Sequence, residues 1–467
     1  MPKSFSLLLA FGILSCGCTM IPQYRQPTAP VAAQFPAAAA TNESHVADMA
    51  WKDFIADERL RKITGLALTN NRDLRVAVLN VAQSRAQYRI SRANLYPEID
   101  ATGNYTRAQT STAGLGSIGG GSSTFTYSQW SASIGTSAYE VDLFGRVRSL
   151  NREALEKYFA TAEAQRAATI TLVAEVATQY FALRQAEEQV RLAQQTLRVV
   201  LESYQLNKAT FDAGAVNELD LRTAEGQVET ARLYLVDYER QRAQAENVLV
   251  LLVGTSLPSD LPQPSAFGAS NLLAAVSPGL PSELTLRRAD ILEAEHTLKA
   301  ANADIGAARA AFFPRITLTT SVGTTSSQLS QLFGAGTGVW SFAPQVTLPI
   351  FTGGRLRGDL DASKISKSIE MAQYEKAIQT AFREVADALV ATGSYAKEIE
   401  TEASLAQTQQ RRYELANARY RLGEDSYLNV LSAQQDLYSA QQGMLQAQYN
   451  QLTGKIALYK ALGGGWK

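Results

Sequence analysis

The two halves of this sequence repeat each other, and this duplication limits the fold more than any other feature. The stretch Asp73 to Pro97 and the stretch Asp290 to Pro314 have the same internal spacing, at an offset of 217 residues. Farther along the chain the offset settles at 209 residues. Similarity at a fixed offset indicates a duplicated structural unit, so each half is expected to build the same succession of elements. The pairs that keep the second offset include Gly145 and Gly354, Tyr204 and Tyr413, Gly214 and Gly423, and Gly254 and Gly463.

A ladder of mainly apolar residues with a seven-residue spacing runs through each half. A 3.5-residue period kept over many turns predicts coiled-coil packing rather than the single face of a globular helix. From about Val147 to Phe211 the helix would be roughly 100 Å long at 1.5 Å per residue. Gly214 and Gly423 suit a left-handed helix end, so each rod is expected to turn back as a helical hairpin. The two ladders are Leu155, Ala162, Thr169, Val176, Leu183, Val190, Leu197, Tyr204 and Phe211, and then Met371, Ile378, Val385, Thr392, Ile399, Ala406, Tyr413 and Tyr420.

Between the first helix and the rod of each half, the apolar period changes from 3.5 to 2. Alternation over about ten residues with aromatic positions is typical of a membrane β-strand. The alternative is a small soluble β-domain with one face of its sheet exposed to solvent. Gly/Ser-rich loops at 114–123 and 326–338 join the expected strands. The alternating positions are Trp130, Ala132, Ile134 and Thr136 in the first half, and Ile316, Leu318, Thr320, Val322, Trp340, Phe342, Val346, Leu348 and Ile350 in the second.

The N-terminus has the order of a secretory signal, with Lys3, an apolar run over 5–14 and small residues before a cysteine. We expect cleavage before Cys18 and acylation of that cysteine, as in a bacterial lipoprotein. Cys16 is the alternative acylation site, and an ordinary signal with an incidental cysteine is a third reading. Thr19 rather than Asp after Cys18 carries no inner-membrane retention signal, so export to the outer membrane is expected.

Composition argues against several functional classes. The 44 basic and 44 acidic residues cancel, so no electrostatic footprint for nucleic acid is present. The cysteines Cys16 and Cys18 and the histidines His45 and His296 are too few and too scattered for a metal cluster or Cys–His catalysis. Gly-rich phosphate loops and Ser/His/Asp sets are also missing, so the chain is not expected to be an enzyme or to need a metal. After residue 18 no apolar stretch approaches the length of a membrane helix.

These observations give an expected division of the chain. The signal peptide is followed by an extended, Pro/Ala-rich segment, and a Pro/Ser-containing linker separates the two repeats. The expected boundaries are 1–17 for the signal, 18–49 for the lipidated segment, 50–254 for repeat 1 with a helix, a β-hairpin at 97–143 and a helical hairpin at 147–254, 255–284 for the linker, and 285–464 for repeat 2 with a helix, a β-hairpin at 314–351 and a helical hairpin at 355–462.

Two β-hairpins supply only four strands per chain, which cannot close on themselves. An open sheet edge cannot lie in lipid, so other copies of the chain must complete the sheet. Three copies give twelve strands and a wide lumen, whereas two copies give eight strands, which enclose side chains rather than water. The sequence favours a trimer without excluding a dimer.

Several segments resemble one known family over essentially the whole chain. The chain is similar to the TolC-type outer-membrane factors, and most closely to the OprM-like and MtrE-like lipoprotein branch that serves resistance-nodulation-division multidrug pumps. The segments that carry the resemblance are Cys18 to Tyr24, Glu140 to Arg146, Asn302 to Pro314, Tyr374 to Gln379 and Leu458 to Gly465.

The resemblance implies a homotrimer with a twelve-stranded outer-membrane β-barrel and a long periplasmic α-barrel. It implies an exit channel that conducts small molecules passively, contributes to antibiotic resistance and works with a periplasmic adaptor protein and an inner-membrane resistance-nodulation-division pump. It implies no cofactor beyond the covalent lipid (palmitate) on the N-terminal cysteine. Two alternatives stay open, namely an export channel for secreted proteins and a structural coiled-coil lipoprotein of the envelope.

The resemblance also implies a periplasmic gate near the turns of the helical hairpins. Leu428 matches the apolar constriction residue of the family, and Ser432 and Gln435 lie on the same helix face at i+4 and i+7. Close relatives carry an Asp and an Arg at these two positions, so a salt-bridged lock is not expected there. Asp220, Arg222 and Glu225 after Gly214 and Asp436 after Gly423 are candidates to supply charges instead, and the alternative is that they are solvated surface residues.

Overall fold

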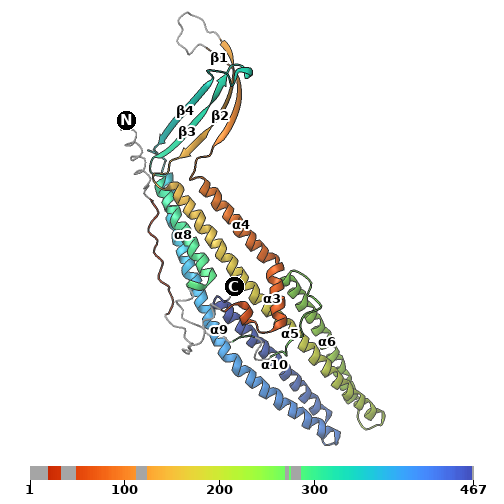
Figure 1. Cartoon of the computed structure of the whole chain (residues 1–467). Coiled ribbons are helices and arrows are strands. Elements are labelled where there is room, and N and C mark those ends of the chain that lie inside the picture. Colours follow the sequence, from red (N-terminus) through yellow and green to blue (C-terminus); the bar gives the residue numbers. More distant parts are fainter. Residues whose placement is uncertain (1–18, 33–48, 112–123, 269–272, 275–285, 465–467) are drawn as a thin grey trace, which may run out of the picture. The chain divides into compact units, whose positions relative to one another are not determined.

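The computed structural model describes residues 19–32, 49–111, 124–268, 273–274 and 286–464. The expected signal segment, Cys16, Cys18, the loop 114–123 and parts of the expected linker lie outside these residues. The described part consists mainly of long helices with one four-stranded antiparallel sheet (Figure 1). This confirms the fold class expected from the sequence.

Both halves follow the same order of elements, and the first half has additional short helices before its strands. Its single expected helix is divided at Asn71, whose side chain accepts a hydrogen bond from the backbone N–H of Leu74 at 2.8 Å and so begins a new helix. The first half contains α2 (Trp51–Phe54), α3 (Glu58–Asn70), α4 (Arg72–Ala93), β1 (Asp100–Ser111), β2 (Thr124–Glu140), α5 (Arg146–Asp212) and α6 (Glu218–Val253). The second half contains α8 (Ala289–Ala310), β3 (Arg315–Ser326), the short 3-10 helix η3 (Leu329–Gln331), β4 (Gly338–Thr347), α9 (Arg355–Arg421) and α10 (Tyr427–Ala461).

Three pairs of glycines show that the two halves are structural repeats. Each pair occupies equivalent turns, and all six residues have a left-handed backbone that favours glycine. Their φ angles are 78° at Gly145 and 89° at Gly354, 72° at Gly214 and 75° at Gly423, and 76° at both Gly254 and Gly463. At Gly254 a Cβ would also lie only 2.4 Å from the carbonyl oxygen of Asn70, so that turn excludes any side chain.

The described chain forms two compact units. The first unit comprises the sheet and the helical residues next to it, within 19–27, 81–161 and 294–374. The second unit comprises the remaining helical residues, within 28–80, 162–293 and 375–467, and includes the turns of both helical hairpins. The long helices α5 and α9, of 67 residues each, contribute to both units.

The sheet of the first unit has one apolar face and one polar face. In the order β1-β2-β3-β4, Ala101, Ile134, Val322 and Trp340 lie opposite one another in a row across all four strands. Neighbouring rows on this face add Tyr105 with Trp130, whose ring centroids are 4.3 Å apart, and Phe342. Val322, Trp340 and Phe342 are exposed. The expected period-2 pattern therefore forms a continuous, outward apolar surface, as in membrane strands.

The other face of the sheet is covered with hydroxyl and amide groups. Hydrogen bonds between neighbouring strands join Thr102 with Ser133 at 2.9 Å and Ser321 with Ser341 at 2.8 Å. Gln129 donates to Thr325 at 2.9 Å on the same face. Thr102, Gln129 and Ser341 are exposed, and the other three side chains are half-buried. This polar face therefore suits contact with water.

The returning strand of the second half is shorter than its sequence pattern indicates. Leu348 and Ile350 were expected to belong to this strand, which is wrong because β4 ends at Thr347. Pro349 lies between the two residues and has no backbone N–H to donate to a sheet. Leu348 and Ile350 are nevertheless exposed, as are the apolar residues of β4.

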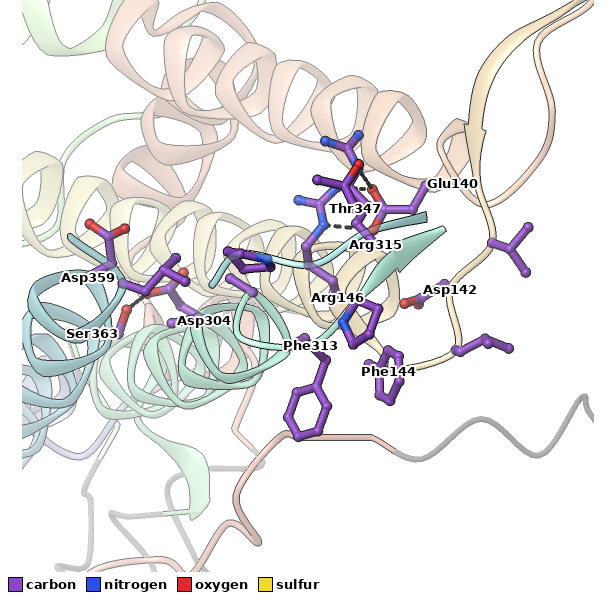
Figure 2. Close-up of a pocket in the computed structure, with 18 of the residues that line it drawn as sticks. Glu140, Asp142, Phe144, Arg146, Asp304, Phe313, Arg315, Thr347, Asp359 and Ser363 are labelled. Atoms are coloured by element: carbon purple, nitrogen blue, oxygen red, sulfur yellow. Dashed lines mark hydrogen bonds and ion pairs between the residues drawn. The ribbon is translucent and has the colours of Figure 1, made fainter. Parts of the chain in front are cut away.

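Charged groups join the strands to the long helices in the first unit. Glu140 at the end of β2 contacts Arg146 at the start of α5 at 2.6 Å and Arg315 at the start of β3 at 2.8 Å (Figure 2). The rings of Phe144 and Phe313 stack beside this cluster with centroids 4.8 Å apart. The cluster lines a cavity of about 530 Å³. Glu140 thus connects three elements where the strands pass into helices.

Residues 19–26 form an extended strap against α8 and α9. Asn302 donates to the carbonyl oxygen of Pro22 at 2.8 Å, and Gln26 donates to the hydroxyl of Tyr374 at 3.0 Å. Gly306 leaves the space that Ile21 occupies, because a Cβ at Gly306 would lie 2.6 Å from the Cγ1 atom of Ile21. The strap (residues 19–26) therefore depends on a glycine in the C-terminal part of α8.

One buried carboxylate connects α5 and α8. Glu156 lies 2.7 Å from Nδ1 of His296 and 2.6 Å from Arg152, and its side chain is 2% exposed. Burial alone would raise the pKa of Glu156, but the hydrogen bond with His296 and the charge of Arg152 hold it below its ordinary value. His296 is therefore part of a packing contact between helices.

The apolar ladders of the long helices are buried in their central parts. Val176, Leu183 and Val190 of α5 and Ile378 and Val385 of α9 are all 6% exposed or less. This agrees with helix-to-helix packing along a seven-residue seam. Among the residues that the structure describes, no helix combines the length and the apolar character that crossing a bilayer requires.

We predict that Gly306→Ala loosens the strap and lowers the unfolding temperature. The new methyl group would lie 2.7 Å from the Ser149 hydroxyl and 2.9 Å from the backbone nitrogen of Ile21, and overpacking of this kind costs about 1–3 kcal/mol. Limited proteolysis should then cleave within the strap sooner than in the wild type.

The matched control is Gly393→Ala in α9, where a Cβ meets nothing within 4 Å. This variant should gain about 0.5–1 kcal/mol of stability from the better helix propensity of alanine. If both variants shifted the unfolding temperature in the same direction, the described packing at Gly306 would be incorrect.

Candidate functional site at the hairpin ends

The two helical hairpins of the second unit end in turns of the same geometry. Gly214 donates its backbone N–H to Phe211 at 2.8 Å, and Gly423 donates to Tyr420 at 2.9 Å. The residue after each glycine then donates to the fifth preceding residue, at 2.9 Å and 3.0 Å. These bonds satisfy carbonyl groups that a helix end leaves free.

The return helices begin with different caps. Asn217 accepts a hydrogen bond from the backbone N–H of Asp220 at 2.9 Å and caps α6. Before α10, Asp425 accepts bonds from the backbone of Ser426 at 2.8 Å and from the side chain of Asn429 at 2.5 Å. These hydrogen bonds hold the pKa of Asp425 below its ordinary value. Both turns are therefore tightly hydrogen-bonded.

Aromatic residues fill the space between the hairpins above these turns. Tyr427 and Val430 of α10 pack on Ala224 of α6, and Tyr204, Tyr413, Ala416 and Tyr420 cover this cluster. The rings of Tyr420 and Tyr427 lie 5.5 Å apart. A cavity of about 630 Å³ lies beside the cluster, between α5, α9 and α10. The hairpins thus touch through side chains that leave free space.

One hydrogen bond links the ends of α5 and α9 directly. The hydroxyl of Tyr420 donates to Oδ1 of Asn207 at 3.0 Å, and Asn207 is fully buried. The amide of Asn207 in turn donates to the carbonyl oxygen of Ser203 at 2.9 Å. Burial and the charge of Asp220 raise the pKa of Tyr420, so its hydroxyl stays protonated and available as a donor.

Farther from the turns, uncharged side chains join α5 to α10. Gln185 donates to Gln446 at 2.9 Å, and Gln189 donates to Gln442 at 3.2 Å. Gln442 also donates to the hydroxyl of Tyr438 at 3.2 Å. Amide groups carry no charge, so salt and pH have little influence on this contact between the two hairpins.

The structure places the residues expected at a constriction near the start of α10. Leu428 is the second residue of this helix and is 67% exposed, although leucine is usually buried. Ser432 is half-buried and Gln435 is exposed. Leu219, the repeat equivalent of Leu428, is similarly exposed at the second position of α6.

An ion pair that sequence analysis did not find lies next to Ser432. Arg412 of α9 pairs with Asp436 of α10, and the same guanidinium contacts the hydroxyl of Ser432 at 3.4 Å. Arg412 and Asp436 are each twelve residues from Glu424 in the turn. In an antiparallel hairpin, residues at equal distances from the turn lie opposite each other, and this signal could have identified Arg412 as the partner of Asp436.

The charges expected on α6 lie along its own surface. Arg222 contacts Glu225 at 2.8 Å and Glu218 at 3.4 Å, both on the same helix. Exposed pairs of this kind contribute little stability. Asp220 is half-buried and close enough to Tyr420 to raise the pKa of that tyrosine. The structure therefore brings Asp220, but not Arg222, toward the contact between the hairpins.

No group of three or more His, Cys, Asp or Glu residues suited to a metal ion occurs in the described part of the chain. The expected acylation sites Cys18 and Cys16 lie outside that part.

Comparisons with known proteins agree with this architecture. The family model of the outer membrane efflux protein matches residues 63–255 and 280–464. The probable efflux pump outer membrane protein TtgC of Pseudomonas putida is 46% identical over 100% of this chain and 96% of its own length. The outer membrane protein OprJ of Pseudomonas aeruginosa is 43% identical over 96% of this chain and 93% of its own length.

Solved structures give the same assignment. The open state of the MtrE outer membrane channel of Neisseria gonorrhoeae has a TM-score of 0.88 and 41% identity, with 96% of this chain and 99% of that chain covered. A membrane protein of Pseudomonas aeruginosa has a TM-score of 0.89 and 42% identity, over 96% of this chain and 98% of its own. The chain therefore belongs to the outer membrane efflux protein family and serves as an outer-membrane exit channel of an efflux pump.

Proposed function

We propose that three copies of this chain form the exit channel of a tripartite multidrug efflux pump, which conducts small molecules passively from the periplasm to the cell exterior. The observation that carries this proposal is the four-stranded sheet with one exposed apolar face and two free edges. Small molecules as cargo are supported by the relatives, among which an antibiotic efflux pump protein of Pseudomonas putida is 46% identical.

The free edges of the sheet require other copies of the chain. β1, with 12 residues, and β4, with 10 residues, each pair with only one neighbour in the sheet. An unpaired backbone group in lipid costs several kcal/mol. Pairing of β1 with β4 of another copy removes this cost at both edges when the ring closes. Twelve strands from three copies leave room for water, whereas eight do not.

Two helices next to these edges carry apolar flanks that suit the same contact. β1 follows α4, on which Leu79, Gln83, Ala86 and Ile90 are exposed at heptad spacing. β4 precedes α9, whose Ile365 and Ile369 are also exposed. A head-to-tail contact that pairs β1 with β4 brings these flanks together as well. Head-to-tail contacts close into rings when the rotation from one copy to the next completes a full turn.

The proposed gate consists of Leu428, Ser432 and Gln435, together with Asp220 and Arg222. Support comes from the exposure of Leu428 at the end of a hairpin, where three copies would bring three leucines together. Apolar side chains around a narrow opening exclude water. The ion pair between Arg412 and Asp436 holds the surface behind Ser432 in place.

The proposal includes a lipid on Cys18, with Cys16 as the alternative site, and a location in the outer membrane with extension into the periplasm. The strap supports the anchor, because it holds the chain from Met20 onward against α8. The proposed partners are a periplasmic adaptor protein and an inner-membrane resistance-nodulation-division pump. The channel itself is proposed to catalyse no reaction and to need no cofactor.

We predict that the detergent-solubilised protein has three times the mass of one chain by light scattering. Ile90→Glu combined with Ile365→Glu should yield monomers, because charges would be buried without partners at the contact between copies. Ser366→Glu, an exposed change on α9 away from the apolar flank, should leave the trimer intact. A monomeric wild-type protein with folded hairpins would contradict the shared channel.

Leu428→Glu should raise the open fraction of single channels in planar bilayers. Three carboxylates brought together repel one another and attract water, so we expect an increase of about tenfold, equivalent to about 1.4 kcal/mol. Leu219→Glu is the matched control at the equivalent position of the first hairpin and should change the open fraction less than twofold. Equal effects of both changes would place the constriction elsewhere.

Tyr420→Phe should also favour opening, through a different contact. The change leaves Oδ1 of the buried Asn207 without its donor, which costs about 1–3 kcal/mol. If this bond breaks when the channel opens, its loss destabilises the closed state by that amount. The open fraction of single channels in planar bilayers should then rise. Tyr413→Phe removes a hydroxyl from the same cluster and should have little effect. An unchanged open fraction in Tyr420→Phe would show that the bond persists in both states.

A further inference from the structure

Helix α4 carries an unusual excess of positive charge. Its 22 residues include five arginines and a single acid, Asp73. All five arginines are exposed, and none forms an ion pair within the described part of the chain, although exposed arginines on α5 and α6 do. The five arginines are Arg72, Arg75, Arg85, Arg89 and Arg92.

Three of these arginines lie on one face of the helix. Arg89 follows Arg85 by four residues, and Arg92 follows Arg89 by three, so the three guanidinium groups are neighbours. Like charges at these spacings destabilise a helix. On α6, by contrast, Arg232 has an acidic partner three residues away, Glu229. The unfavourable arrangement on α4 suggests that an anion compensates it.

The internal repeat identifies the face of α8 that is equivalent to the arginine face of α4, and the contacts of that face are known. At the offset of 217 residues, Arg85, Arg89 and Arg92 correspond to Asn302, Gly306 and Arg309 of α8. All three positions of α8 contact the strap: Asn302 donates to Pro22, Gly306 leaves space for Ile21, and Arg309 donates to the carbonyl oxygen of Met20 at 3.4 Å. The corresponding face of α4 is exposed.

An apolar peptide like the strap does not fit the face of α4. The strap requires glycine at position 306, where even a Cβ would come within 2.6 Å of Ile21. The corresponding position on α4 is Arg89, which occupies that space with a long cationic side chain. The chemistry of this face therefore suits an anionic ligand rather than a second strap.

The position of this face points to the membrane as the source of the anion. The strap begins one residue after Cys18, the proposed lipid site. The face of α8 that the strap covers is therefore on the outer, membrane-anchored side of the proposed channel and not on the side of the lumen. α4 ends at Ala93 and the first membrane strand begins at Asp100, so Arg92 and Arg89 lie within about 6 Å of the helix end along its axis. The nearby Tyr96 and Ile99 are also exposed.

We propose that Arg85, Arg89 and Arg92 bind the phosphate groups of anionic phospholipids in the inner leaflet of the outer membrane. This proposal rests on the proposed function, because it requires strands that span that membrane. Guanidinium groups bind phosphate oxygens in a bidentate manner. Clusters of arginines next to a membrane segment are typical of anionic lipid recognition.

The test measures binding of fluorescent phosphatidylglycerol to the purified full-length protein in neutral detergent, with phosphatidylcholine as the comparison lipid. The variant combines Arg85→Gln, Arg89→Gln and Arg92→Gln. Each arginine contributes about fivefold to binding of an anionic lipid, so the Kd for phosphatidylglycerol should rise about 100-fold. The salt dependence of binding should decrease at the same time.

The matched control combines Arg191→Gln, Arg232→Gln and Arg240→Gln, which removes the same charge from other exposed helix surfaces. Its Kd should stay within twofold of the wild-type value. Equal Kd values for wild type and the α4 variant, or equal binding of the two lipids, would overturn the proposal. Competition by inorganic phosphate as effective as that by the lipid would show a site for free phosphate instead.

Bilayer conductance separates this proposal from the proposed function. The α4 variant should still form channels, because these arginines are not part of the gate. Conducting wild-type protein that does not prefer phosphatidylglycerol would overturn only the lipid site. Wild-type protein that never conducts would contradict the channel itself.

Discussion

The structure depends on the need to pair every backbone N–H and C=O group that lies in lipid. A single chain cannot meet this need, because β1 and β4 each keep one unpaired side. The apolar face of the sheet makes water an equally poor environment for the same strands. Assembly with other copies resolves both problems at once. Folding of the sheet and formation of the channel are therefore best understood as one event.

The duplicated halves form two similar hairpin units. The two units differ mainly in the side chains at equivalent positions, and these differences give each half its own contacts. The equivalent turns keep the same left-handed glycines, so the backbone has changed little. The side chains at equivalent positions have diverged. On α8, Gly306 leaves a notch that Ile21 of the strap occupies, whereas the equivalent face of α4 carries arginines. At the hairpin ends, an Arg–Asp pair joins α9 to α10, but its equivalents in the first hairpin, Ser203 and Gln227, are uncharged.

Much of the fold could be predicted because long periodic patterns determine it. The seven-residue ladders and the period-2 stretches indicated the rods and the strands, and the glycine pairs indicated the turns. The end of β4 was missed, since apolar alternation continues through Leu348 and Ile350 although Pro349 interrupts the backbone pairing. The domain boundaries and the residues of the gate remain predictions. Contacts such as Tyr420 with Asn207 join positions about two hundred residues apart, and no local pattern reveals them.

The notch at Gly306 has a consequence for how the assembly sits in the bilayer. Ile21, which packs against α8, lies only three positions after Cys18, the proposed lipid site. A fully extended chain of that length spans at most about 11 Å. In the proposed lipid-anchored trimer, the acyl chains on Cys18 would therefore enter the leaflet within that radius of the notch, once per subunit. Three such points define a plane, so these proposed tethers would resist both tilting and vertical displacement of the complex.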